Sequence, residues 1–88
     1  MKIWKWVLQI TDRQIVDMPE GAQLLSVQVQ QGSCCVWALC DPTVILAPRC
    51  IAIYGTGNHI PECAGAYIST FQMYGGDLVF HAFEVDCE

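Results

Sequence analysis

The sequence has little positive charge. Four of its 88 residues are Lys or Arg and nine are Asp or Glu, which gives a formal net charge of −5. Nucleic-acid backbones are bound by dense basic patches, and so few basic residues do not supply one. We therefore expect no direct DNA or RNA partner. An acidic chain of this kind suits a basic patch on another protein instead.

Long apolar runs and export signals are lacking as well. No stretch approaches the roughly 20 apolar residues that span a bilayer. The opening, MKIWKWVLQITDRQ, interleaves lysines with a short apolar stretch and has no small-residue cleavage site. We expect no membrane contact and a location in a reducing cytoplasm.

The six cysteines lack the spacings of a zinc or redox motif. There is no C-x-x-C and no paired Cys/His spacing. We favour free buried thiols over the alternatives of disulfides or a metal site, and expect neither metal nor cofactor. The thiols expected to be buried in apolar runs are Cys34, Cys35, Cys40 and Cys50, and those expected to be exposed and oxidisable are Cys63 and Cys87.

Hydrolase and nucleotide-enzyme motifs are absent too. Of the two histidines, His81 lies within a β-like run and is expected to be structural. His59 follows a glycine-rich turn and is the better candidate, but any of six thiols could be paired with it, so the pairing carries no weight. We expect no catalytic residues and no enzyme.

What the sequence does contain is alternation of apolar and polar residues, the pattern of β-strands. In residues 2–8, Trp4, Trp6 and Leu8 fall on one face. Residues 23–30 are predicted to be a half-buried antiparallel strand. Strict alternation places Leu25, Val27 and Val29 on its inner face. Residues 34–41 and 49–55 are apolar on both faces, so each is expected to be central or covered by another subunit.

The remaining segments complete an all-β chain. Residues 14–18 are predicted to form a short strand, 41–49 a connection bounded by prolines, and Gly75-Gly76 the turn of a terminal hairpin. That hairpin is expected to set Tyr67, Phe71 and Met73 on a face with Phe83 or its neighbours. The prediction is one domain, residues 1–88, folded as a compact antiparallel sandwich or small barrel of six or seven short strands. The 53% hydrophobic content also predicts a homo-oligomer.

Several segments together resemble a family of short, uncharacterised phage and prophage proteins. They are the opening K-I-W-K with TDRQ, then MPEGAQLLSVQVQ, VWALCDP, AIYGTGNHIP and YISTFQMYGGDLVFHAFEV. The resemblance spans nearly the whole chain and implies a phage origin, a location in the infected bacterial host and a stand-alone domain with no catalytic assignment. The cysteine-rich segments depart from the pattern, and no functional residue is carried over.

The glycine-rich loop YGTGNH is the candidate ligand-binding segment of the sequence. It lacks the third glycine of a dinucleotide fingerprint and the lysine of a P-loop, but its glycines would let backbone N–H groups approach an anion. The alternative is a plain chain reversal. The candidate ligand residues are this loop, two arginines and one tryptophan: Tyr54, Gly55, Thr56, Gly57, Asn58, His59, Arg13, Arg49 and Trp37.

We expect a non-enzymatic phage accessory protein that acts by binding. It would oppose bacterial defence either by sequestering a small nucleotide signal or by blocking a host defence protein through an acidic, aromatic surface. The alternative is a small structural or virion-associated β-domain that functions through oligomerisation.

Overall fold

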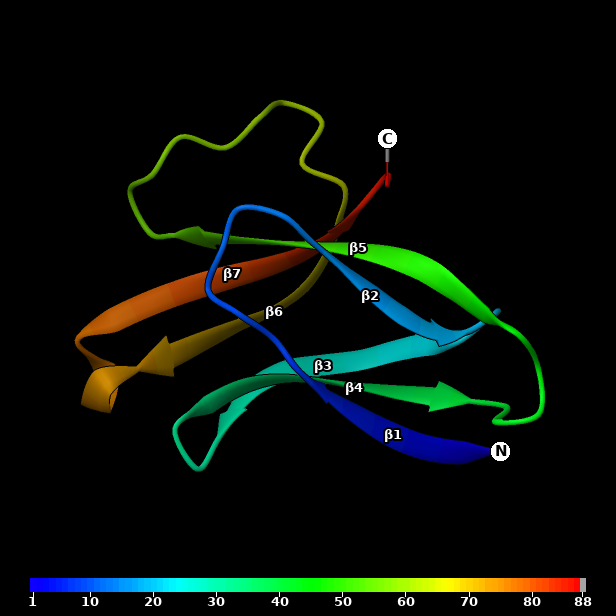
Figure 1. Cartoon of the computed structure of the whole chain (residues 1–88). Helices are drawn as coiled ribbons and strands as arrows, with labels where there is room; N and C mark the ends of the chain where they lie inside the picture. The colour runs from blue at the N-terminus through cyan, green and yellow to red at the C-terminus, as the bar shows by residue number, and fades with distance from the viewer. Residues whose placement is uncertain (88) are drawn as a thin grey trace.

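Seven β-strands and one short 3-10 turn make up the computed structural model, which describes residues 1–87 (Figure 1). The strands form two antiparallel sheets, so the prediction of an all-β sandwich is confirmed. In order along the chain, the elements are β1 (Lys2–Val7), β2 (Gln14–Pro19), β3 (Gln23–Gln30), β4 (Ser33–Cys40), β5 (Leu46–Gly55), β6 (Ala66–Met73), η1 (Tyr74–Gly76) and β7 (Leu78–Val85).

The three-stranded sheet has the order β1-β4-β3. Trp4 and Trp6 of β1 share one face, as the alternation predicts. They lie opposite Ala38 and Val36 of β4, and this face turns toward the second sheet. β4 is the central strand. One of its faces meets the core, and on the other the Lys5 and Gln30 side chains reach across β4 from β1 and β3.

The prediction that Leu25 points inward is wrong. A β-bulge between Leu24 and Ser26 places an extra residue in β3, and a bulge shifts the alternation by one position. Leu24 packs against the core in its place, while Leu25 is 43% exposed. Val27 and Val29 do lie on the inner face, because they come after the bulge.

The four-stranded sheet has the order β2-β5-β7-β6. The strand predicted at 14–18 is confirmed, but the predicted connection at 41–49 is too long, because β5 already begins at Leu46 and runs through Pro48. Pro48 pairs with Asp17 of β2, beyond the last residue of β5 that pairs with β7, Cys50. A proline has no N–H to donate, and it is tolerated at this position because β5 pairs there with β2 alone.

A second bulge, between Tyr67 and Ser69 of β6, corrects the predicted face of the terminal hairpin. Tyr67 lies opposite Phe83 on the outer side of the sheet, as expected. Phe71 instead lies opposite Phe80 on the inner side, and Met73 follows it into the core. The Gly75-Gly76 turn is confirmed, with φ of 68° and 96°.

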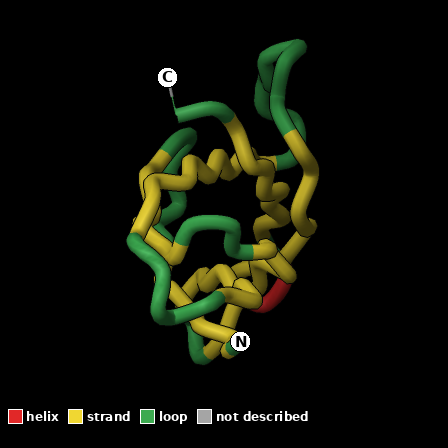
Figure 2. Tube along the Cα trace, turned by 90° about the vertical axis from the view of Figure 1, so that its right-hand side faces the viewer, coloured by secondary structure: helices red, strands yellow, loops and turns green. Residues whose placement is uncertain are grey.

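The two sheets are joined along both edges. At one edge Ser69 of β6 accepts a hydrogen bond from the backbone N–H of Val27 in β3 at 2.8 Å. At the other edge the segment between β1 and β2 crosses from sheet to sheet: Leu8 donates to the Cys34 carbonyl, and Ile53 donates to the Thr11 carbonyl. Figure 2 shows the strands arranged around a common interior.

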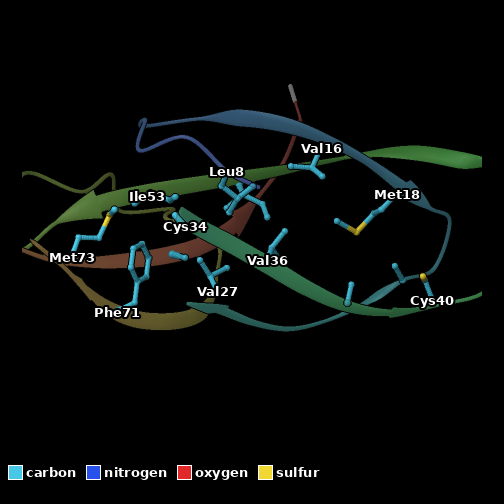
Figure 3. Packing of buried hydrophobic residues seen from close by; sticks show 14 residues of the cluster. Leu8, Val16, Met18, Val27, Cys34, Val36, Cys40, Ile53, Phe71 and Met73 are labelled. Carbon is cyan, nitrogen blue, oxygen red and sulfur yellow. The ribbon is translucent and has the colours of Figure 1, made fainter. Parts of the chain in front are cut away.

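The core fills the space between the sheets (Figure 3). Met18, Val27, Val36 and Ile51 are fully buried within it. Cys34, Cys35, Cys40 and Cys50 are also buried, while Cys63 and Cys87 are exposed, as the sequence predicts. Burial, with a smaller contribution from Cys35, raises the pKa of the Cys34 thiol to about 11. No helix within residues 1–87 is long and apolar enough to cross a membrane.

Candidate binding surface

A row of aromatic rings lies on the outer side of the four-stranded sheet, facing away from the three-stranded one. Phe83 is directly opposite Tyr67, with ring centroids 5.6 Å apart, and diagonal to Tyr54, with centroids 6.1 Å apart. Both pairs adopt the inclined geometry that aromatic quadrupoles favour. Tyr67 is 60% exposed, so the row is open to a partner.

Beside the rings, His81 of β7 is joined through hydroxyl groups to β6 and to the turn that follows β5. Its Nε2 lies 2.7 Å from Oγ1 of Thr56, and its Nδ1 lies 2.9 Å from Oγ1 of Thr70. The Thr70 hydroxyl in turn lies 2.7 Å from the hydroxyl of Tyr67. We call Tyr54, Tyr67, Thr70, His81 and Phe83 the aromatic face.

The direction of this hydrogen-bond chain follows from its end. Thr56 Oγ1 donates to the Val79 carbonyl at 3.3 Å, so it accepts from His81 Nε2–H. His81 Nδ1 then accepts from Thr70, and Thr70 accepts from Tyr67. Each threonine hydroxyl donates once and accepts once, the Tyr67 hydroxyl donates to Thr70, and this arrangement fixes the Tyr67 ring before any partner arrives.

The glycine-rich loop is explained by chain reversal. Gly57 has φ of +88° with open space around it, and Gly55 is crowded by the side chain of Asn58, 3.0 Å from where a Cβ would lie. The backbone N–H of Thr56 donates to the Val79 carbonyl, and that of Asn58 to the Gly55 carbonyl. Two N–H groups that an anion would need therefore already have partners.

The chain after this turn rises on the outer side of the four-stranded sheet and returns to it at β6 (Figures 1 and 2). His59 lies in this exposed segment. Between the start of the loop and the beginning of β7 is a groove of about 420 Å³, lined by Gly55, Thr56, Asn58, Asp77, Leu78, Val79 and Phe80. The one acidic side chain of that lining is Asp77, which disfavours a phosphate there.

The two arginines of the predicted site lie elsewhere and are engaged. Arg49 projects from the inner face of β5, where its guanidinium forms an ion pair with Glu84 of β7 and donates to the Ala22 carbonyl at 2.7 Å. The hydrogen bond to Glu84 raises the pKa of Arg49 above its ordinary value. Arg13 donates to the carbonyl of Asp86.

Trp37 lies on the opposite side of the molecule, on the outer face of the three-stranded sheet between Lys5 and Ser26. The predicted ligand residues are therefore divided among the loop, the interior and both outer faces. Sequence analysis missed Tyr67, Thr70 and Phe83 as neighbours of Tyr54. The alternation of β7 placed His81 and Phe83 on one face, but the bulge in β6 concealed which of its residues join them.

Residues 1–87 contain no group of three or more His, Cys, Asp or Glu side chains placed to hold a metal ion. Comparison with protein families gives a match: the model of a domain of unknown function, DUF7352, matches residues 1–88. The chain belongs to the DUF7352 family. This agrees with the expected resemblance to an uncharacterised family. No curated protein and no solved structure matches the chain.

Proposed function

We propose that this DUF7352 protein is a non-enzymatic phage accessory protein that acts in the bacterial cytoplasm by binding and blocking a host defence protein. The observation that carries the proposal is the aromatic face, in which three rings and a hydrogen-bonded histidine are organised on an open sheet surface. Tyrosine-rich patches with ordered neighbours are the usual anchors of protein interfaces.

The charge of this side of the molecule indicates the chemistry of the partner. Among the described residues of β2, β5, β6 and β7, those on the outer face include Asp17 and neither Lys nor Arg. Glu62 and Asp86 are exposed in the segments next to the sheet. An acidic rim around aromatic anchors suits a partner with a basic surface, and binding of this kind weakens as salt is raised.

The geometry supports a protein partner over a small nucleotide. A phosphate needs cations or unpaired N–H groups, and both arginines proposed for that role donate elsewhere. The N–H groups of Thr56 and Asn58 are used within the loop. His81 likewise has both ring nitrogens bonded to threonine hydroxyls, which supports a structural role for it within a binding face.

The proposal includes self-association, for which the observation is β1. It is an edge strand with one unpaired side, and Ile3 and Val7 on its outer face are 60% and 67% exposed. An exposed edge with apolar side chains favours pairing with a second copy. Native mass spectrometry tests this: we expect a discrete oligomer that Val7→Lys dissociates and that Ile45→Ser, a change at another exposed apolar residue, leaves intact. A monomeric wild type contradicts it.

Binding is tested by a matched pair of tyrosines. Tyr67 on the aromatic face is 60% exposed, and Tyr74 on the β6–β7 turn is 68% exposed. Wild-type protein, Tyr67→Ala and Tyr74→Ala would each be immobilised, and proteins captured from bacterial lysate would be quantified by mass spectrometry. We expect a captured protein that Tyr67→Ala loses at least about tenfold and Tyr74→Ala retains. Equal capture by all three variants contradicts the proposal.

A further inference from the structure

Two cysteines far apart in the sequence meet at one end of the four-stranded sheet. Cys50 of β5 lies directly opposite Val85 of β7. Cys87 follows Val85 by two residues, and side chains two apart in an extended chain point to the same side. The two thiols therefore lie on the same side of this end of the sheet, and the Cys50 thiol is the largest influence on the pKa of Cys87.

The chain is held in place at this point. The Arg13 guanidinium, from the segment between β1 and β2, bonds to the carbonyl of Asp86, the residue before Cys87. The two thiols therefore lie at a junction of three chain segments, where a disulfide between them would cross-link β5 to the chain that follows β7.

The two thiols differ in access. Cys50 is 1% exposed, whereas Cys87 is exposed to solvent. A soluble oxidant therefore reaches Cys87 first, and Cys50 is positioned to react with what forms there. The third thiol of this region, Cys63, lines a groove of about 410 Å³ together with Val85 and Asp86, and is the competing partner.

We propose that Cys50 and Cys87 form an intramolecular disulfide when the protein meets a peroxide. Hydrogen peroxide transfers one oxygen to the sulfur of Cys87, giving a sulfenic acid and one water. The sulfur of Cys50 then attacks that sulfur. The S–S bond forms, the S–O bond breaks, and the hydroxide leaves with the proton of Cys50 as a second water. The inference does not rest on the proposed function.

The surroundings set the rate of this reaction. The neighbouring Cys50 thiol raises the pKa of Cys87 above its ordinary value of 9.0, with burial and Glu84 adding to the shift and Arg13 opposing it. Since the thiolate is the reactive form, oxidation is slow at neutral pH. Its rate increases about tenfold for each pH unit up to that pKa.

The cleavage sites in the sequence allow the three cysteines to be distinguished by peptide mapping. Cleavage by trypsin after Arg49 and by a glutamate-specific protease after Glu62 and Glu84 puts Cys50, Cys63 and Cys87 on three separate peptides. Reduced full-length protein would be treated with hydrogen peroxide, its remaining thiols alkylated, and the non-reduced digest mapped by mass spectrometry. We expect a cross-linked pair of peptides joining Cys50 to Cys87, with the loss of two hydrogens.

Two variants test whether Cys50 or Cys63 is the disulfide partner of Cys87. Cys63→Ser should form the same cross-link at an unchanged rate, while Cys87→Ser should leave Cys50 unoxidised because it stays buried. The oxidised wild type should also unfold at a higher temperature than the reduced protein, and Cys87→Ser should show no such shift. A Cys63–Cys87 cross-link, or over-oxidation of Cys87 with Cys50 still free, would overturn the proposal.

Discussion

The outer faces of the two sheets are covered differently. On the three-stranded sheet, two long side chains joined by a hydrogen bond cover the centre of β4. On the four-stranded sheet, aromatic rings and hydroxyl groups cover the outer face. Lys5 donates to Gln30 at 2.6 Å across β4, and Cys35 lies between them, 1% exposed. The aromatic face has two ring pairs and a histidine bonded at both nitrogens. The first arrangement shields a thiol. The second holds a recognition surface in one conformation.

Among substitutions that test this comparison, we expect the largest effect on stability and binding at Phe83, which contacts both tyrosines of the aromatic face. We expect Phe83→Ala to lower the free energy of unfolding by about 2–3 kcal/mol, less than for a fully buried ring because Phe83 is half-buried. It should also abolish capture of the partner. Denaturant unfolding and the capture assay measure the two effects. Trp37→Ala, on the other outer face, should retain capture, and its loss there would contradict the comparison.

The two histidines provide the next test. His81→Ala removes the link between Thr56 and Thr70 and should cost about 1–2 kcal/mol, while exposed His59→Ala should change stability by less than about 0.5 kcal/mol. Hydrogen exchange at the Thr56 amide should speed up in His81→Ala alone. Similar exchange in both variants would show that the hydroxyl chain does not hold the loop.

A smaller effect is expected at Lys5. Because Lys5 and Gln30 are exposed, Lys5→Ala should cost no more than about 1 kcal/mol. It should, however, uncover Cys35 and increase its rate of alkylation under native conditions. Lys2→Ala removes the same charge from the same strand and is the control. If both variants protect Cys35 as the wild type does, the Lys5–Gln30 pair is not its cover.

The last effect is absent at neutral pH, and it distinguishes the inner side of β4 from the outer side. The Cys34 thiol, on the inner side, ionises near pH 11 in the folded protein and near 9.0 in the unfolded chain. Between those values the unfolded chain binds fewer protons, so stability should fall as the pH rises from about 9 to about 11. Cys34→Ala should give a shallower decline in pH-dependent denaturant unfolding. An identical decline would mean that this thiol does not contribute.

Sequence patterns predicted most of the sheets because alternation and turn chemistry are local. The central positions of β4 and β5, the Gly75-Gly76 turn and the shared face of Trp4 and Trp6 all follow from neighbouring residues. The two bulges do not. Leu24 and Leu25 are equally apolar, so nothing in residues 23–30 shows which one turns inward, and the β6 bulge at Ile68 is hidden in the same way.

The candidate site depended on those hidden positions. Tyr54 was identified because of the adjoining glycines, yet its nearest aromatic partner is Phe83, whose face is set by strand pairing between distant segments. Arg49 looked like a free cation in the sequence. Its partner, Glu84, is brought to it by the pairing of β5 with β7, which long-range register alone determines.

The central claim is that the aromatic face, and not the outer face of the three-stranded sheet, meets the partner. Hydroxyl-radical footprinting with and without the captured partner compares both faces in one experiment. We predict that bound partner protects Tyr54, Tyr67 and Phe83 from oxidation and leaves Trp37 and Leu39 unchanged. Protection of Trp37 and Leu39, with Tyr67 still oxidised, would contradict the account.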